Sequence, residues 1–217
     1  METARRIARE GGRVLAASRH PILADEEEVF GIECDVGEKD QILACVDEAY
    51  RRFGRWDVVV NNAGTMGFKM LVDQEPEDWD AELRVDLIGA FLFTREALRR
   101  MERGGTIVNV ASIHAVTTTP QVAPYAASKA ALLSLTRSAS IEGREKGIRA
   151  NAVLPGAIDT PMLWENPNVK SGVETVAPTD VGKPEEVAAA IAFLASEDAS
   201  FVHGSALRVD GGRLDAL

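Results

Sequence analysis

The sequence predicts an α/β fold with a doubly wound, three-layer parallel sheet, and two observations carry this prediction. Short apolar segments of strand length alternate with longer segments of helical periodicity along the chain. Residues 56–60 lack the polar alternation of a half-exposed strand, as is typical of parallel strands buried on both faces. Alternating strands and helices imply right-handed crossovers. At 217 residues the chain has the length of one domain with a substantial core, so a single domain over residues 1–217 is expected.

The elements are expected in the following order. A helix over residues 2–10 presents one apolar stripe and is stopped by two glycines. Pro76 at a first-turn position, with acidic residues after it, predicts a long helix that continues to about residue 100. Residues 156–183, rich in Pro, Asn and Gly, are expected to form an irregular excursion. Strands are predicted at residues 13–17, 29–35, 56–60, 106–110, 148–154 and 206–209, and further helices at 41–53, 125–146 and 184–195.

Composition excludes several classes of protein. The chain carries 24 Lys and Arg against 34 Asp and Glu, a formal net charge of -10, which is unfavourable for a nucleic-acid or an anionic-membrane surface. No apolar run approaches the roughly 18 residues that a membrane-spanning helix needs. Cys34 and Cys45 lack metal-ligand spacing and are expected to be buried, reduced thiols. A cytoplasmic protein that acts on a small molecule is the class that these features favour.

Residues 104–129 bring a serine, a tyrosine and a lysine together. Tyr125 and Lys129 are four residues apart on a predicted helix, which places them on one face. A tyrosine hydroxyl has a pKa near ~10, and a neighbouring ammonium group favours the phenolate and lowers that pKa. Ser112 lies at the carboxyl end of a predicted strand, where ligands bind in open α/β sheets. The three side chains therefore predict an acid–base site at which a hydroxyl holds a carbonyl oxygen beside the tyrosine.

Four short motifs follow one another along the chain. They are NNAG at residues 61–64, the set Ser112, Tyr125 and Lys129, LPGAIDTPM at 154–162 and VDGG at 209–212. Their order and spacing resemble those of the short-chain dehydrogenase/reductase family. This resemblance covers nearly the whole chain and implies a Rossmann-like, NAD(P)-dependent oxidoreductase that interconverts a ketone and a secondary alcohol.

The resemblance also implies roles for the three side chains. Tyr125 would be the general acid–base, Lys129 would lower the tyrosine's pKa and hold ribose hydroxyls of the cofactor, and Ser112 would position the substrate oxygen. A homodimer or homotetramer is implied as well. The two long predicted helices, at residues 79–100 and 125–146, carry apolar residues on more than one face, which favours the same conclusion.

Further residues are implied around the cofactor and the substrate. Ser18 stands where the family has an acidic residue for the ribose hydroxyls of NAD, and Arg19 suits the 2′-phosphate of NADP, so NADP is favoured over NAD. Arg19 as a solvated loop residue is the alternative. The remaining cofactor residues are expected to be Asp35, Val36, Asn62, Ala63, Gly64, Pro155, Gly156, Ile158 and Thr160. The substrate pocket is expected to hold His114, Met162, Leu163 and Trp164, with packing roles as the alternative.

The front of the chain departs from the family's pattern. In the family, a first strand and a Thr-Gly-x-x-x-Gly-x-Gly loop precede the first helix, and the glycines let backbone amides approach the cofactor's pyrophosphate. This sequence contains no such loop. The strands at residues 13–17 and 56–60 would each lose a neighbour. We expect one of three solutions: a chain that starts upstream, direct pairing of the two strands, or a segment from a partner subunit.

A second departure is Asp86, which stands where the family commonly has a catalytic asparagine. A carboxylate only accepts hydrogen bonds and carries a negative charge. We therefore expect Asp86 to pair with Lys129, to raise the pKa of Tyr125 and to weaken activity without abolishing it. Together with the absent loop, Asp86 leaves a second function open: a non-catalytic relative that binds dinucleotide weakly or not at all and serves as an interaction module.

Overall fold

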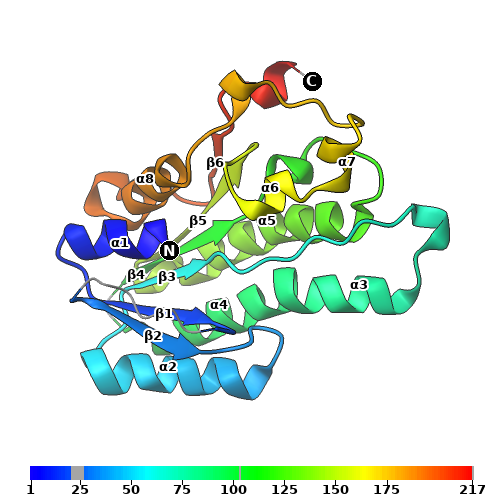
Figure 1. Cartoon of the computed structure of the whole chain (residues 1–217). Helices are drawn as coiled ribbons and strands as arrows, with labels where there is room; N and C mark the ends of the chain where they lie inside the picture. The colour runs from blue at the N-terminus through cyan, green and yellow to red at the C-terminus, as the bar shows by residue number, and fades with distance from the viewer. Residues whose placement is uncertain (21–26, 103, 217) are drawn as a thin grey trace.

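The computed structural model describes residues 1–20, 27–102 and 104–216, and within them six strands form two parallel sheets (Figure 1). One sheet has the order β1-β2 and the other the order β3-β4-β5-β6. The predicted α/β architecture is confirmed. The strands are β1 Val14–Ser18, β2 Val29–Glu33, β3 Val58–Asn61, β4 Gly105–Val110, β5 Ile148–Pro155 and β6 Ala206–Val209. The helices are α1 Glu2–Arg9, α2 Lys39–Phe53, α3 Pro76–Leu83, α4 Ala90–Arg100, α5 Ala123–Gly143, α6 Pro161–Trp164, α7 Pro167–Lys170 and α8 Pro184–Ala195.

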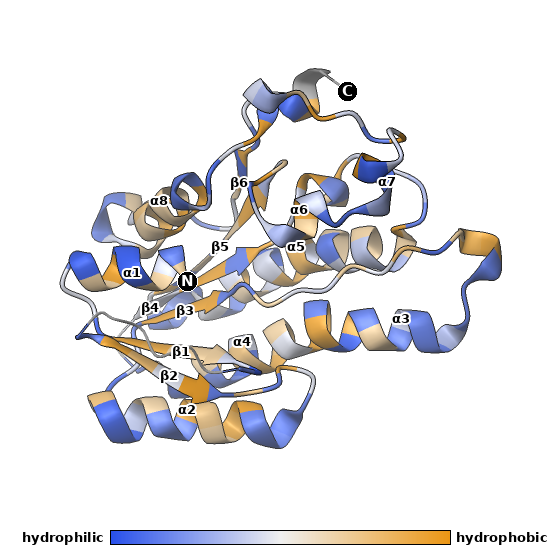
Figure 2. Ribbon diagram, viewed as in Figure 1, coloured by the Kyte–Doolittle hydropathy of each residue, from blue (hydrophilic) through white to orange (hydrophobic). Residues whose placement is uncertain are grey.

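Helices cover both faces of the four-stranded sheet, as the prediction of doubly buried strands requires. Figure 2 shows apolar strands between the helical layers. Ile107 of β4 packs with Ala97 and Ala139 of α4 and α5, whereas the next residue, Val108, packs with Ile191 of α8. Successive side chains of a strand point to opposite faces, and both of these are fully buried. The sheet is therefore the middle layer of three.

The long helix predicted to run to residue 100 is interrupted. Between α3 and α4, the segment Arg84–Gly89 is π-helical, and its buried residues are Asp86 and Gly89. A side chain is excluded at Gly89, since a Cβ there would lie 2.6 Å from the carbonyl oxygen of Val36. Single π-helical turns within α-helices often occur at functional sites. This turn places Asp86 in the interior.

The two sheets are not joined by strand pairing. β1 pairs with β2, from Val14 opposite Val29 to Ser18 opposite Glu33, and β3 pairs with β4. The described residues contain no ladder between β1 and β3. Of the three alternatives, direct pairing of these two strands is therefore wrong. Packing of α2 against α4 and of α1 against α8 connects the two parts of the fold.

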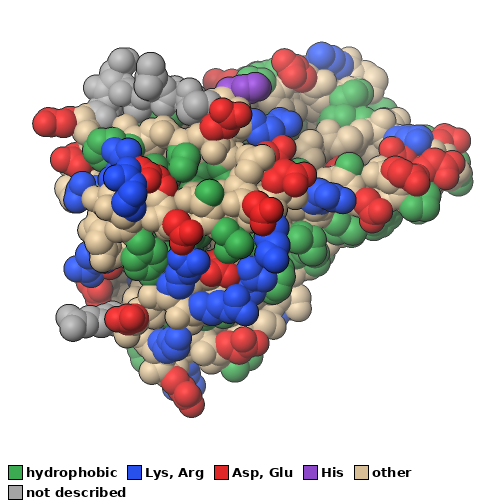
Figure 3. All heavy atoms as spheres, turned by 90° about the horizontal axis from the view of Figure 1, so that it is seen from below, with side chains coloured by type: hydrophobic (Ala, Val, Ile, Leu, Met, Phe, Trp, Pro, Cys, Tyr) green, Lys and Arg blue, Asp and Glu red, His purple; other side chains and the backbone are tan. Residues whose placement is uncertain are grey.

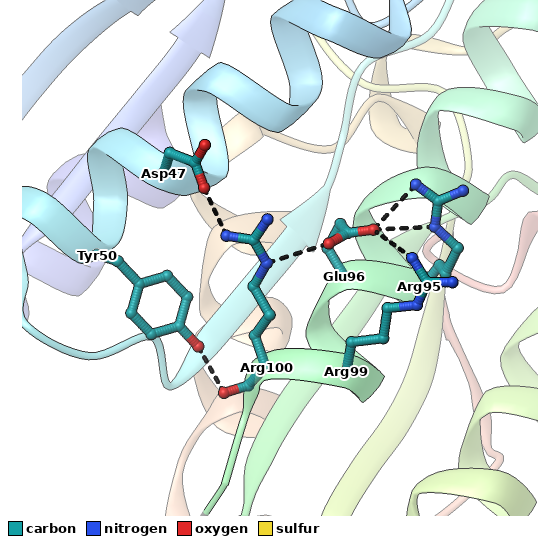
Figure 4. Close-up of polar contacts among 6 residues, drawn as sticks. All are labelled: Asp47, Tyr50, Arg95, Glu96, Arg99 and Arg100. Carbon is teal, nitrogen blue, oxygen red and sulfur yellow. Dashed lines mark hydrogen bonds and ion pairs between the residues drawn. The ribbon is translucent and has the colours of Figure 1, made fainter.

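Polar contacts hold α2 against α4 (Figure 4). Arg100 of α4 contacts Asp47 of α2 at 2.5 Å and Glu96, one turn back on its own helix, at 3.1 Å. The hydroxyl of Tyr50 donates to the carbonyl oxygen of Arg100 at 2.7 Å. The same two helices also share an apolar cluster of Cys34, Ile42, Cys45 and Leu92. Both cysteines are free thiols and buried, as expected.

Charge is mixed over the surface. On the face seen from below in Figure 3, acidic and basic side chains are interspersed and do not gather into one positive patch. Among the described residues, no helix is long and apolar enough to cross a membrane.

Candidate active site

A cavity of about 530 Å³ opens where three neighbouring parallel strands end. Its wall includes residues that directly follow β3 (62–64), β4 (110–114) and β5 (155–158). Because parallel strands end at the same edge of a sheet, these segments converge. We call this space the strand-end cavity, and its volume is within the range of small-molecule sites, roughly 300–1,000 Å³.

Most of the predicted site residues lie in this wall. They are Asn62, Ala63, Gly64, Ser112, His114, Tyr125, Lys129, Pro155, Gly156, Ile158, Thr160, Met162 and Leu163. The predicted residues outside the wall are Ser18, Arg19, Asp35, Val36, Asp86 and Trp164.

The residues outside the wall have other contacts. The indole of Trp164 donates to Asp159 at 2.7 Å, and the side chain is 48% exposed. Asp35 accepts a hydrogen bond from the backbone of Gly37 at 2.8 Å. The hydroxyl of Ser18 donates to the carbonyl oxygen of His20 at 2.6 Å. Asp86 lies behind the wall, 1% exposed.

Ser112, Tyr125 and Lys129 are brought together as predicted. Ser112 follows β4 with an extended backbone, and its hydroxyl accepts from the backbone of His114 at 3.2 Å. Helix α5 begins at Ala123 and presents the other two side chains one turn apart. The ammonium nitrogen of Lys129 lies 5.3 Å from the centre of the Tyr125 ring, and the Ser112 hydroxyl is close enough to the tyrosine to act on its pKa.

The ammonium group of Lys129 has two further partners. It lies 3.3 Å from Asp86 Oδ2 and donates to the carbonyl oxygen of Val110 at 3.3 Å. The predicted ion pair is therefore present. The other oxygen of Asp86 accepts from the backbone N–H of Thr65 at 2.7 Å. Burial raises the pKa of Asp86, and the charge of Lys129 opposes that rise.

The pKa of Tyr125 is raised in the structure. Burial raises the pKa of Tyr125 to about 12; the hydrogen bond to Ser112 opposes the rise, and the charges of Asp86 and Glu82 add to it. The ammonium group of Lys129 is paired with Asp86 at 3.3 Å. The predicted effect of Asp86 on the tyrosine has the correct sign. Tyr125 is consequently a protonated phenol at neutral pH.

Two glycines allow the loop after β3 to approach these charges. A Cβ at Gly64 would lie 3.1 Å from the ammonium nitrogen of Lys129, and one at Gly67 would lie 2.6 Å from Glu82 Oε1. The backbone N–H of Gly67 donates to that oxygen at 2.9 Å. Glu82 was not predicted as a site residue. Its spacing of four from Asp86 was the available signal, since it places both carboxylates on one side of a helix.

A buried polar chain fixes the strand ends beneath the cavity. The amide of Asn61, at the end of β3, donates to Asn109 of β4 at 2.8 Å. Asn109 in turn donates to the hydroxyl of Thr136 on α5 at 2.8 Å. These bonds tie two strands to the helix that carries Tyr125 and Lys129, so the site is built on rigid elements.

The cavity also contains an ion pair that was not predicted. Arg213, directly after the VDGG motif, contacts Glu174 at 2.8 Å, and both residues line the wall. Beside them His114 meets the Tyr125 ring edge to face, with the ring centres 5.7 Å apart. Burial lowers the pKa of His114, which favours its neutral form.

Comparison with known proteins places the chain in a family. The sequence pattern of the family described as Enoyl-(Acyl carrier protein) reductase matches residues 1–213. The 3-oxoacyl-[acyl-carrier-protein] reductase FabG of Thermotoga maritima is 40% identical over 182 residues, which cover 82% of this chain and 74% of that protein. The 3beta-hydroxysteroid dehydrogenase 1 of Eggerthella lenta is 37% identical over 228 residues, which cover 96% of this chain and 87% of that protein.

A solved structure agrees with the sequence matches. The 3-ketoacyl-(acyl-carrier-protein) reductase from Brucella melitensis, complexed with NADH, superposes with a TM-score of 0.89 at 31% identity, covering 98% of this chain and 92% of that one. With the fold, the strand-end cavity and these matches in agreement, the chain belongs to the short-chain dehydrogenase/reductase family and is an oxidoreductase.

Proposed function

We propose that the chain interconverts a ketone and a secondary alcohol with a nicotinamide dinucleotide, using Ser112, Tyr125 and Lys129. The observation that carries this proposal is the meeting of the three side chains in the wall of the strand-end cavity. The name of one relative contains an oxo group and that of another contains a hydroxyl group, which are the oxidised and the reduced form in such a reaction.

Each side chain has a separate task. Ser112 donates to the substrate oxygen and holds it beside Tyr125. The phenol of Tyr125 gives its proton to that oxygen during reduction and takes one back during oxidation. The phenol is protonated at neutral pH, as a tyrosine with an ordinary pKa would be, and burial raises the pKa further, so the free enzyme is prepared for carbonyl reduction. Lys129 carries the positive charge of the site and donates to ribose hydroxyls.

The residues present fit a dinucleotide. Gly64 and Gly156 stand where a Cβ would meet Lys129 at 3.1 Å and Asp210 at 2.9 Å, so backbone borders the cavity at both points. Asn62 and Ala63 beside Gly64 would hold the adenosine ribose, and Pro155, Gly156, Ile158 and Thr160 the nicotinamide carboxamide. When bound, the dinucleotide supplies or accepts the hydride. We propose NADP as the preferred form, with Arg19 near the 2′-phosphate.

The substrate and the assembly complete the proposal. His114, Met162 and Leu163 line the cavity beside Tyr125 and would contact a small-molecule carbonyl compound. Ile88 and Phe91 are 46% and 40% exposed on the long helical stretch, which supports a homodimer or homotetramer formed through that surface.

One observation favours a second candidate function. Asp86 stands where the family commonly has an asparagine, and its carboxylate pairs with the ammonium group of Lys129 at 3.3 Å, so that charge is engaged within the protein. A relative with this feature would bind dinucleotide weakly and act as an interaction module.

Dinucleotide binding separates the two candidates. NADPH and NADH are titrated into the protein while nicotinamide fluorescence is followed, and turnover is then measured on a panel of ketones that includes a 3-oxoacyl thioester and a 3-oxosteroid. Saturable binding with ketone reduction supports the oxidoreductase. Binding far weaker than about 1 mM, which corresponds to roughly −4 kcal/mol, supports the second candidate.

A further inference from the structure

Two buried carboxylates hold the loop of residues 64–67 against the helix below it. The backbone N–H of Thr65 donates to Asp86 Oδ1 at 2.7 Å, and that of Gly67 donates to Glu82 Oε1 at 2.9 Å. The two acids are four residues apart, so alternate amides of the loop meet successive helical turns. We call this arrangement the carboxylate clamp.

The clamp is enclosed by protein. Glu82 is 7% exposed and Asp86 is 1% exposed. Gly67 is required for the contact, since a Cβ there would lie 2.6 Å from Glu82 Oε1. The second oxygen of Glu82 has no hydrogen-bond partner among the described residues. An ionised carboxylate in this position has lost its hydration and has no cation paired with it in the described part of the chain.

The charged groups around Glu82 are mostly negative. Burial raises the pKa of Glu82 to about 7, the N–H of Gly67 opposes the rise, and nearby carboxylates add to it. The groups that face it from its own helix, from α5 and from the loop are Asp78, Asp86, Lys129 and Tyr125, with Lys69 paired to Asp78 at 2.7 Å. Lys129 is already paired with Asp86, so ionised Glu82 adds a negative charge that has no ion-pair partner among the residues that the structure describes.

We propose that Glu82 is a positioning residue of this site, whose gain or loss of a proton sets how readily Tyr125 gives up its own. An ionised Glu82 disfavours the phenolate by repulsion, and a neutral one does not. The effect on turnover rests on the proposed function, whereas the effect on the loop and on the phenol does not. Alcohol oxidation, which needs the phenolate, therefore begins at a higher pH with Glu82 than without it.

The first measurement follows the loop itself. The amide signal of Gly67 is recorded against pH in ¹⁵N-labelled protein, in the parent, in Glu82→Gln and in Glu77→Gln, an exposed glutamate on the same helix. The parent and Glu77→Gln are expected to pass through one transition near pH 7, and Glu82→Gln to lose it. A parent without this transition, or an unchanged transition in Glu82→Gln, overturns the proposal.

The second measurement follows Tyr125. In Glu82→Gln, the pH midpoint at which alcohol oxidation rises is expected to fall by roughly half a pH unit or more, and in Glu77→Gln to stay in place. Equal midpoints in the parent and Glu82→Gln overturn the proposal.

If the parent oxidises no alcohol, the proposed function fails, and ¹³C NMR of the tyrosines then tests the proposal. The chain has only Tyr50 and Tyr125, so Tyr50→Phe leaves one tyrosine signal. A pH midpoint of the Tyr125 signal that is lower in Glu82→Gln by roughly half a pH unit or more supports the proposal, and equal midpoints contradict it.

Discussion

Replacing Glu82 by glutamine is expected to make the protein more stable, and only at neutral or alkaline pH. The pKa of Glu82 rises from an ordinary value of 4.5 to about 7 on folding, mainly through burial. The folded state therefore holds this proton more tightly than the unfolded state, so stability falls as pH rises through this interval. The rise corresponds to about 3 kcal/mol of unfolding free energy lost above pH 7, since one pKa unit is about 1.4 kcal/mol. Glutamine keeps the acceptor for Gly67 and removes the charge.

Urea unfolding of the parent, Glu82→Gln and the exposed control Glu77→Gln at two pH values tests this. At pH 8 we expect Glu82→Gln to be more stable by about 3 kcal/mol, or roughly 6–12 °C in Tm for a chain of this size. At pH 5 the gain is expected to be below about 1 kcal/mol, because Glu82 is then largely protonated when folded. The reasoning is refuted if Glu82→Gln gains the same stability at both pH values, or if Glu77→Gln behaves in the same way.

Three further variants test the site. Asp86→Asn removes the charge that raises the pKa of Tyr125, so the pH profile of alcohol oxidation is expected to move to lower pH and turnover at neutral pH to increase; an unchanged rate and profile would contradict this. Gly64→Ala places a methyl group 3.1 Å from the ammonium nitrogen of Lys129 and is expected to weaken dinucleotide binding about tenfold, or ~1.4 kcal/mol, in a fluorescence titration. Arg19→Ala is expected to weaken NADPH binding about tenfold and leave NADH binding unchanged, and equal losses for both would show that Arg19 does not contact the 2′-phosphate.

The sequence predicts the strands and the meeting of Ser112, Tyr125 and Lys129 well because both are local patterns. Apolar runs define β4 and β5 to within a residue or two, and the i, i+4 spacing of Tyr125 and Lys129 needs only a helix. The π-helical turn of Arg84–Gly89 has no recognisable sequence pattern, since nothing in its composition distinguishes it from the helix on either side.

The electrostatics of the site depend on burial and on contacts distant in sequence. The pairing of Asp86 with Lys129, 43 residues later, is predicted from the departure from the family's pattern. Burial, the largest cause of the raised pKa of Tyr125, is not. Glu82 stands at visible spacing from Asp86, but only the fold reveals that it is buried under the loop of Gly67. Composition and periodicity do not contain this information.

Transfer of deuterium from 4-deuterated NADPH to a ketone tests the central claim most directly, namely that Tyr125 supplies the proton for hydride transfer at the strand-end cavity. We predict that the parent places deuterium on the carbinol carbon of the alcohol product. Tyr125→Phe, which keeps the ring and loses the hydroxyl, is expected to bind NADPH as the parent does and to form at least about a hundredfold less labelled alcohol. A Tyr125→Phe enzyme that labels the product as fast as its parent would contradict the account.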